Sequence, residues 1–568
     1  MRRWLYVVLT AALAVAVAVW AIPHFDEPGW FGYVGQSVPG IVPPLPSLSP
    51  DLFLFPVSAQ IVLLAVGIGL LVQIYSTAYL GHHPRYRSYA LIIILFLVAM
   101  IAVVGTTNLW VVLVGWEVMG LCSYLLIGHE WQTPEARAGA AKAFLITRIA
   151  DLGLVLAILV IGETYGTYDM IGASAAMSDD GPQSSTVIGL LVLVAVVGKS
   201  AQFPLHTWLP DAMPGPTPIT ALIHAATMVA AGVYLAARLF QFYADSAVVL
   251  TAMAVIAGIT MLMGAVFAFV QTDLKRALAW STVSQLALMF AAISAGHPAA
   301  GTDHLLAHGV FKALLFLGCG CLMHAVGSSA LSAMGGLRRS MPATFWSMTV
   351  GFAALAGVVP TAGFFTKDSV LEALLHADRE LPGGVGVALF AVALLTSLIT
   401  AAYAARLWIL AFLVRAPDER RAVTHDAPHA MTGPIVVLAV ATLALSIGQP
   451  FHLGIGLLST AIAAAGIAAV FVAWRNGRSL DLDAPWLTAE LGLDRPYARW
   501  IPATLRSSAQ AVVDVDRDGV DAYSYGSAFV AHRVSRVLAL VQSGNVQRYA
   551  TVIAAGVIVV TAAAVIWA

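Results

Sequence analysis

Apolar runs of about 20 residues recur along the whole chain, separated by short polar or proline- and glycine-rich segments. A run of this length is enough for one helix to cross the hydrocarbon core of a bilayer. The pattern therefore predicts an all-α polytopic membrane protein with about fifteen transmembrane helices. We place them at roughly 4–22, 52–79, 88–107, 109–128, 143–162, 185–203, 216–240, 247–270, 278–295, 303–326, 343–376, 384–412, 431–449, 452–474 and 547–567.

Two of these predicted helices contain their own breakers. Pro204 follows Lys199 by five residues, and the run 343–376 is interrupted around Pro360, shortly before Lys367. Proline removes a backbone donor, and irregular backbone at membrane depth is tolerated only where it lines protein or water. We therefore predict broken helices near Lys199 and Lys367, a pattern typical of transporter sites.

Residues 475–545 differ from the rest of the chain because they are polar, mixed in charge and apolar only at helical spacing. Such an isolated amphipathic stretch is typical of a helix that lies along the membrane surface or along a neighbouring subunit. We predict a lateral segment on the cytoplasmic side, followed by a terminal transmembrane anchor at 546–568. Gly519 and Gly526 leave open whether the segment is one continuous helix.

The composition agrees with a membrane location, since 60% of the 568 residues are hydrophobic and only 10% are charged. Soluble domains carry about 25% charged residues. The net charge of −1 gives no reason to expect a nucleic-acid partner. Cys122, Cys319 and Cys321 lack the spacing of a metal site, and neither a dinucleotide fingerprint nor a P-loop occurs. We therefore expect no cofactor and no metal in this chain.

Lysine and arginine gather in alternate loops, which predicts the orientation. Cationic loops include those at Arg2–Arg3, Arg85–Arg87, Lys275–Arg276 and Arg338–Arg339, whereas the loops 23–51, 163–184, 241–246 and 295–302 contain neither residue type. Cationic loops stay on the cytoplasmic side. We expect a cytoplasmic N-terminus, an external C-terminus and a plasma-membrane location. The first apolar run is interpreted as a retained span, because no clear small-residue cleavage site follows it.

Titratable side chains lie inside several of the apolar runs. A charged lysine at mid-bilayer depth costs roughly 2.5–3.5 kcal/mol on insertion scales. A chain that carries many such groups is expected to move protons or ions. The candidates are Glu117, Arg148, Asp151, Lys199, His224, His304, His308, Lys312 and Lys367, with Asp368 directly after Lys367.

Glu117 finds no cation within its own run, so we expect it to pair with Lys199 on another helix. A carboxylate that approaches or leaves a buried lysine changes the proton affinity of the amine, so such a pair can take up and release a proton. Arg148 and Asp151, three residues apart on one helix face, are expected to compensate each other in part. A purely structural buried ion pair is the alternative.

His304, His308 and Lys312 follow one another at intervals of four residues and span about 12 Å along one helix face. Because histidine titrates near neutral pH, this stripe predicts a proton relay into Lys312. His224 follows the first break and is placed to relay from Lys199. The alternatives are hydrogen-bonded core histidines and, for the lysines, packing kinks with snorkelling side chains.

Several of these stretches together resemble the antiporter-like large subunit, of the subunit L or subunit 5 type, of proton-pumping NADH:quinone oxidoreductase (complex I). The matching stretches are GWEVMGLCSYLLIG at 115–128, KAFLITRIAD at 142–151, GKSAQFPLHTWLPDAM at 198–213, and those at 215–228, 271–276, 308–316 and 361–368. They cover about residues 50–415. The same superfamily includes large subunits of multisubunit sodium/proton antiporters, membrane-bound hydrogenases and energy-coupling partners of bicarbonate-accumulating complexes.

The resemblance implies two inverted five-helix repeats at 88–240 and 247–412, flanked by helices within 1–87 and 413–474. It implies that Glu117 and Lys199 are the coupling pair, His224 a connecting relay, and Lys312 and Lys367 the central and exit-side lysines. The tail from 475 onward resembles the lateral helix and anchor of the complex I subunit.

The function implied is proton translocation by a non-redox subunit of a redox-driven translocase, with other membrane subunits and the bilayer as partners. A sodium/proton antiporter subunit, an energy-coupling subunit for bicarbonate uptake and a non-conducting scaffold are the alternatives.

Overall fold

The computed structural model describes residues 2–22, 56–177, 182–225, 227–415, 423–449, 451–480, 484–542 and 544–567. Within these ranges every regular element is a helix, and the only β-type pairings are the isolated bridges Asn108–Asp169 and Asp273–Ala330. The chain divides into two compact units, Met1–Leu491 and Gly492–Ala568. This division falls inside the predicted lateral segment. The loop 23–51, used above for the orientation, lies outside the described residues.

The first unit holds the helical bundle. Its helices are α1 (Arg2–Ala21), α2 (Pro56–Tyr79), α3 (Tyr86–Gly105), α4 (Leu109–Ile127), α5 (Pro134–Tyr165), α6 (Met170–Ala176), α7 (Pro182–Lys199), α8 (Trp208–Asp211), α9 (Thr217–Ala225), α10 (Met228–Arg238), α11 (Ala247–Val270), α12 (Leu274–Ser294), α13 (Pro298–Val326), α14 (Pro342–Ala356), α15 (Ala362–Leu375), α16 (Val385–Phe412), α17 (His429–Ala444), α18 (Leu453–Arg475) and α19 (Pro485–Thr488), followed by the short 3-10 helix η8 (Glu490–Gly492).

Twelve of the described helices are long and apolar enough to cross a membrane, and two shorter apolar helices, Ser185–Lys199 and His429–Ala444, accompany them. The prediction of an all-helical, multi-pass membrane protein is confirmed at this level. The finer prediction of about fifteen spans in two inverted repeats stays a prediction.

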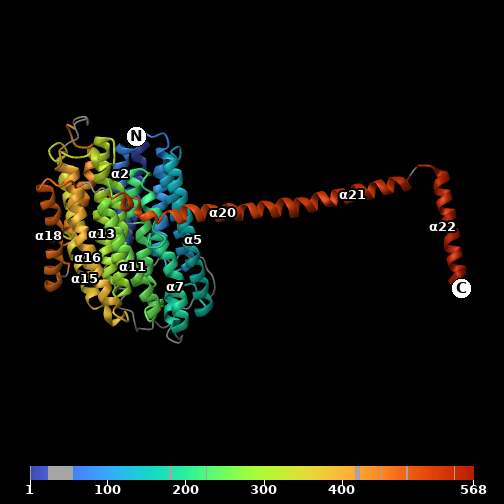
Figure 1. Ribbon diagram of the computed structural model, residues 1–568, viewed down its shortest axis with the longest axis horizontal. Helices are drawn as coiled ribbons and strands as arrows, with labels where there is room; N and C mark the ends of the chain where they lie inside the picture. Colours follow the sequence, from blue (N-terminus) through green and yellow to red (C-terminus); the bar gives the residue numbers. More distant parts are fainter. Residues whose placement is uncertain are drawn as a thin grey trace. The chain divides into compact units, whose positions relative to one another are not determined.

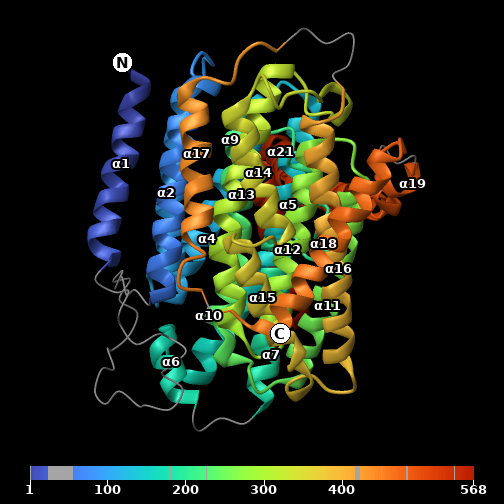
Figure 2. The same ribbon diagram turned by 90° about the vertical axis from the view of Figure 1, so that its left-hand side faces the viewer.

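The centre of the bundle is formed by α12 and α13, which are almost entirely buried. Figure 2 shows both helices among the others of the bundle, with α17 lying beside α2 although the two are far apart in the sequence. Ser281, Ser284 and Gln285 on α12 are buried together with its apolar residues. A helix facing lipid would expose such groups to hydrocarbon, so protein on all sides of α12 is what makes them tolerable.

Both predicted helix breaks are present. α7 ends at Lys199, and the chain reaches α8 through an irregular stretch in which Ala201 adopts a φ of 51°. Between α14 and α15, Gly357 takes a φ of 77°, a left-handed conformation that glycine adopts at little cost. Lys367 lies on α15, just after this second break.

A third interruption was not predicted. The run 216–240 corresponds to one candidate span, Thr217–Arg238, but within it α9 ends at Ala225 and α10 begins at Met228. His224 therefore lies in the last turn of α9. No proline or glycine occupies 219–231, so the sequence carries none of the usual local signals for this interruption.

The second unit contains α20 (Arg495–Val515), a π-helical stretch η9 (Asp516–Asp521), α21 (Ala522–Val541) and α22 (Val546–Trp567). The residues at both junctions of η9 keep helical φ and ψ angles, so α20 runs through η9 into α21 without a break (Figure 1). Gly519 lies inside η9 and Gly526 inside α21. Continuity therefore holds for Arg495–Val541, which includes both glycines, whereas the described residues before Arg495 in the predicted segment 475–545 form only the short helices α19 and η8.

Candidate functional site

Lys199 is completely buried at the C-terminal end of α7. Its Nζ donates to the Asp151 carboxylate on α5 at 3.3 Å and to the Trp116 carbonyl on α4 at 3.3 Å, and it lies 4.6 Å from the centre of the Trp116 ring. Two helices thus supply three groups to one amine: α5 gives a carboxylate, and α4 gives a carbonyl and an aromatic face. Together these contacts offset part of the large cost of burying a charged amine.

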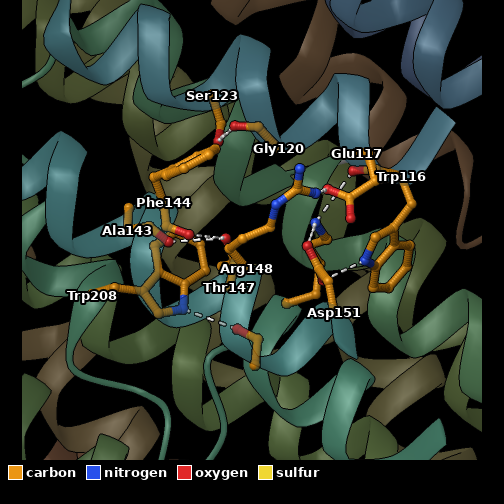
Figure 3. Close-up of polar contacts among 12 residues, drawn as sticks. Trp116, Glu117, Gly120, Ser123, Ala143, Phe144, Thr147, Arg148, Asp151 and Trp208 are labelled. Atoms are coloured by element: carbon orange, nitrogen blue, oxygen red, sulfur yellow. Dashed lines mark hydrogen bonds and ion pairs between the residues drawn. The ribbon is translucent and has the colours of Figure 1, made fainter. Parts of the chain in front are cut away.

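Asp151 is shared between two donors. Its side chain is 3% exposed, one oxygen accepts from Lys199, and the other accepts from the Trp116 indole nitrogen at 2.6 Å. Figure 3 shows Asp151 and Trp116 facing each other across α4 and α5. The carboxylate is therefore held in place by a neutral donor as well as by the lysine. Trp116 was not singled out from the sequence, because an apolar tryptophan in a membrane helix gives no signal of its own.

The predicted Glu117–Lys199 pair is wrong. Glu117 forms its ion pair with Arg148, as Figure 3 also shows, whereas Lys199 pairs with Asp151. The expectation that Arg148 and Asp151 compensate each other is wrong for the same reason, since each binds a partner on another helix. Neighbouring residues on a helix point about 100° apart, so Trp116 faces Lys199 while Glu117 turns outward.

The Glu117–Arg148 pair lies on the outer side of the bundle. The Glu117 side chain is 26% exposed and that of Arg148 is 50% exposed, in helices long enough to span the membrane. Charged groups at membrane depth rarely face lipid. The two pairs are nevertheless neighbours, because Arg148 precedes Asp151 by three residues on α5 and Glu117 follows Trp116 on α4.

A close backbone approach fixes the separation of α5 and α7 beside this pair. A Cβ added to Gly198 would lie 2.1 Å from the Cβ of Ala150. Gly198 and Ala150 directly precede Lys199 and Asp151. The two helices can come this near only because Gly198 has no Cβ. The distance between Lys199 and Asp151 therefore depends on a glycine at position 198.

Lys312 on α13 is also completely buried, but its surroundings differ. Its Nζ donates to the Leu278 carbonyl at 3.1 Å and to the Ser281 hydroxyl, both on α12. Among the described residues no carboxylate lies within ion-pair distance of it. Lys312 therefore has acceptors for hydrogen bonds but no counter-charge.

Lys367 is 3% exposed and reaches back across the second break. Its Nζ donates to the Leu355 carbonyl on α14 at 2.9 Å. Asp368, the next residue, turns away toward α18, where its carboxylate accepts from the His452 backbone amide at 3.3 Å and from the Ser459 hydroxyl at 3.5 Å. The two adjacent charges thus have separate environments, and Asp368 holds the start of α18.

The predicted stripe on α13 is present. His304 and His308 have ring centres 6.3 Å apart, and both are fully buried. One ring nitrogen of His304 lies 2.9 Å from the Thr366 hydroxyl and the other 3.3 Å from the Gln285 side-chain oxygen. Thr366 directly precedes Lys367, so this contact joins the stripe to the second break.

His308 and His224 have no protein partner at either ring nitrogen among the described residues. Both rings are fully buried, and they pack against Phe311 and Phe316 at 5.3 and 4.6 Å between ring centres. Buried polar atoms are seldom left without a hydrogen bond, and ordered water is the usual partner where protein supplies none.

No group of three or more histidine, cysteine, aspartate or glutamate side chains comes together as a metal site within the part of the chain that the structure describes. The three cysteines are buried and unpaired.

Comparison with known proteins decides the family. The family described as "NADH:quinone oxidoreductase/Mrp antiporter, TM" matches residues 106–400, and the one described as "NADH-Ubiquinone oxidoreductase (complex I), chain 5 N-terminus" matches residues 47–90. The chain belongs to this family. The match includes both breaks and every candidate site residue, and it confirms the resemblance found in the sequence.

Two curated relatives illustrate the similarity. The chain is 37% identical over 536 residues to NADH-quinone oxidoreductase subunit L of Mycobacterium tuberculosis (strain ATCC 25618 / H37Rv), which covers 88% of this chain and 84% of the relative. It is 39% identical over 441 residues to NAD(P)H-quinone oxidoreductase subunit 5 of Paulinella chromatophora, covering 71% of this chain and 65% of the relative.

Two solved structures share the fold. A chain of the Mrp complex from Dietzia sp. DQ12-45-1b matches with a TM-score of 0.71 and 28% identity, over 95% of this chain and 63% of that one. A chain of the membrane-bound sulfane sulfur reductase, an archaeal respiratory membrane complex, matches with a TM-score of 0.68 at 21% identity, which supports the fold alone. The relatives are subunits of multisubunit membrane complexes, so further membrane subunits are partners of this chain.

Proposed function

We propose that the chain translocates protons across the plasma membrane as a non-redox subunit of a complex I-like NADH:quinone oxidoreductase. The observation that carries this proposal is the fully buried Lys199, bound to Asp151 and Trp116 at the end of a broken helix. The family match and the curated relatives named subunit L and subunit 5 support the assignment.

The buried groups suggest a route with three parts. It begins at the pair Lys199–Asp151, continues past His224 and His308 to Lys312, and reaches Lys367 through His304. The two histidines without protein partners fit water molecules that carry a proton between fixed groups, since one water bridges polar atoms too far apart for a direct bond. Within the route, each lysine amine takes up a proton from one side and releases it to the other.

Lys199 is the natural point of control. The amine is held between a carboxylate and a carbonyl that belong to different helices, so a small relative movement of α4 and α5 changes the balance of its contacts. A carboxylate near a buried amine favours the charged form, and its withdrawal favours the neutral form. A shift of α5 driven by neighbouring subunits would therefore release or bind a proton at Lys199.

The outer pair Glu117–Arg148 is the proposed contact with such a subunit. Two charges at membrane depth that are part-exposed in the isolated chain need a protein cover. Because Arg148 lies one turn from Asp151, a neighbour that draws Arg148 outward also changes the field at the inner pair. The cytoplasmic N-terminus and external C-terminus predicted from the loop charges belong to the same proposal.

The test uses inverted membrane vesicles that carry the whole complex. Asp151→Asn and Lys199→Met are expected to leave the complex assembled but to lower NADH-driven proton uptake at least tenfold. Glu163→Gln, which removes an exposed carboxylate from the same helix α5, is the matched control and should pump at the wild-type rate. Wild-type proton uptake in both Asp151→Asn and Lys199→Met would refute the proposal.

A sodium/proton antiporter subunit is the second candidate, because the Mrp complex chain shares the fold at 28% identity. Proton flux that follows an imposed sodium gradient and ignores NADH would favour it. Proton uptake that needs NADH and persists without sodium favours the complex I assignment.

A further inference from the structure

A buried acid lies near the end of the first unit, two residues before the C-terminal unit begins in the sequence. Glu490 lies in η8, and only 8% of the residue is exposed. Glu490 and Leu491 have φ angles of 56° and 55°, in the left-handed region that residues with side chains rarely adopt. Such conformations persist where surrounding contacts determine them. The chain continues from Leu491 through Gly492 into α20.

The contacts that determine it come from α12. One carboxylate oxygen of Glu490 accepts from the Arg276 guanidinium at 2.6 Å and from the Trp280 indole nitrogen at 2.9 Å. Arg276 and Trp280 are four residues apart and lie on one face of α12. A charged donor and a neutral donor thus meet at the same oxygen, which is a strong and directional arrangement.

Arg276 also connects Glu490 to α8 and, through α8, to α5, the helix that carries Asp151. Its other terminal nitrogen donates to Asp211 on α8 at 3.1 Å, and the second oxygen of Asp211 accepts from Lys142 on α5 at 2.6 Å. At the same place a Cβ added to Gly139 would lie 2.1 Å from the Asp211 carbonyl, so α5 and α8 also touch through their backbones.

A second series of contacts connects Trp280 to the break after Lys199 through aromatic rings. The Trp280 ring lies 5.6 Å from the His206 ring, which stacks at 5.9 Å on Phe203 in the break that follows Lys199. Trp208 at the start of α8 donates its indole hydrogen to the Gly198 carbonyl at 3.0 Å. Both series of contacts therefore connect Glu490 to the proton site: one reaches α5, the helix of Asp151, and the other reaches the break that follows Lys199.

We propose that Glu490 and Arg276 are positioning residues that set the separation of Lys199 and Asp151. Because Arg276 binds Glu490 and Asp211 at once, the position of α8 depends on the Glu490–Arg276 contact, and through Lys142 so does the position of α5. Lys142 and Asp151 are nine residues apart on α5, about 13 Å along a stiff helix. The Glu490–Arg276 pair thereby regulates the same proton site, so the inference rests on the proposed function.

A clamp that only holds the fold together is the competing explanation, and two measurements separate it from positioning. The first is hydrogen–deuterium exchange of the purified complex, followed by mass spectrometry of peptides that cover 198–213. Glu490→Gln keeps the size of the side chain and an acceptor for Trp280 but removes the charge. Arg276→Lys keeps the charge but loses the fork that bridges two carboxylates.

We expect both variants to speed exchange in 198–213 severalfold and to leave 342–375, the second break, unchanged. Asp514→Asn is the matched control, because Asp514 is an exposed acid of α20 that contacts only Gln510 and Arg517 among the described residues. Unchanged exchange in 198–213, or equal acceleration at both breaks, overturns the positioning role whatever the pumping rate.

The second measurement is the number of protons moved per NADH oxidised in vesicles. Glu490→Gln is expected to lower this ratio two- to fivefold, Glu490→Asp to restore part of it, and Asp514→Asn to leave it unchanged. Asp151→Glu alters the proton site directly. If Glu490 acts through that site, the double variant Glu490→Gln/Asp151→Glu should move as many protons per NADH as the more impaired single variant. If Glu490 only holds the fold together, the two losses are independent and should multiply. If exchange changes as expected while Asp151→Asn pumps normally, the proposed proton site is wrong and the mechanical link stands.

Discussion

Adding a methyl group at Gly198, where α5 and α7 approach each other, tests the geometry of the Lys199–Asp151 pair directly. In Gly198→Ala the new Cβ would start 2.1 Å from the Ala150 Cβ, whereas ordinary van der Waals contact begins at 3.4 Å. The helices α5 and α7 must therefore separate locally by about 1.3 Å, the difference between these two distances. Overpacking of this kind costs about 1–3 kcal/mol of stability, so the chain should still fold and assemble.

The rate of proton uptake should fall although the complex still assembles. Lys199 and Asp151 follow the two clashing residues, and their ion-pair distance of 3.3 Å has little room before it exceeds 4 Å. A displacement of about 1 Å in a proton-transfer geometry costs on the order of 100-fold in rate. We expect NADH-driven proton uptake to fall between 10- and 100-fold, while NADH oxidation and the amount of assembled complex change less than twofold.

The exchange of the two residues supplies the decisive control. Gly198→Ala/Ala150→Gly moves the methyl group to the other helix, keeps one glycine and one alanine, and should restore most of the proton uptake. Gly67→Ala places a methyl group where no atom lies within 4 Å and should have no effect. Wild-type uptake in Gly198→Ala, or a double variant as impaired as the single one, would show that this approach does not set the pair.

Three further predictions use the same vesicles. Glu117→Gln should assemble but pump at least fivefold more slowly, because Arg148 loses its counter-charge; equal losses of assembly and pumping would contradict this. Trp116→Phe removes one hydrogen bond to a charged group, worth about 1.5–3 kcal/mol, so thermal unfolding of the complex should begin at a lower temperature and pumping should fall several-fold. Thr366→Val keeps the shape of the side chain but removes the hydroxyl at His304. It should slow pumping and, because a buried ring nitrogen loses its partner, also lower thermal stability; an unchanged pumping rate would remove His304 from the route.

The sequence predicted the features that depend on local composition. Membrane helices follow from apolar runs, and the breaks beside Lys199 and Lys367 follow from prolines and glycines, because these residues act on their own segment of backbone. The same reasoning found Lys199, Lys312 and Lys367, since a buried amine is costly whatever surrounds it. These parts of the site needed no knowledge of neighbouring helices.

The pairing of charges could not be predicted in this way. Whether Glu117 or Asp151 meets Lys199 depends on the rotation of α4 and α5 about their axes, which is set by packing at positions such as Gly198. Glu490 was missed because its burial comes from α12, more than 200 residues earlier, while its own surroundings in the sequence are polar.

The counter-charges of the buried lysines are unevenly distributed. Lys199 has a carboxylate beside it, whereas Lys312 has only a carbonyl and a hydroxyl among the described residues. A proton that arrives at Lys312 therefore adds a net charge deep within the protein, where a transmembrane voltage acts on it. Carrying one charge across the full membrane takes about 2.3 kcal/mol per 100 mV, and a site at intermediate depth feels a share of that work. The second half of the bundle is thus where the membrane potential should slow turnover, and the first half should be comparatively insensitive to it.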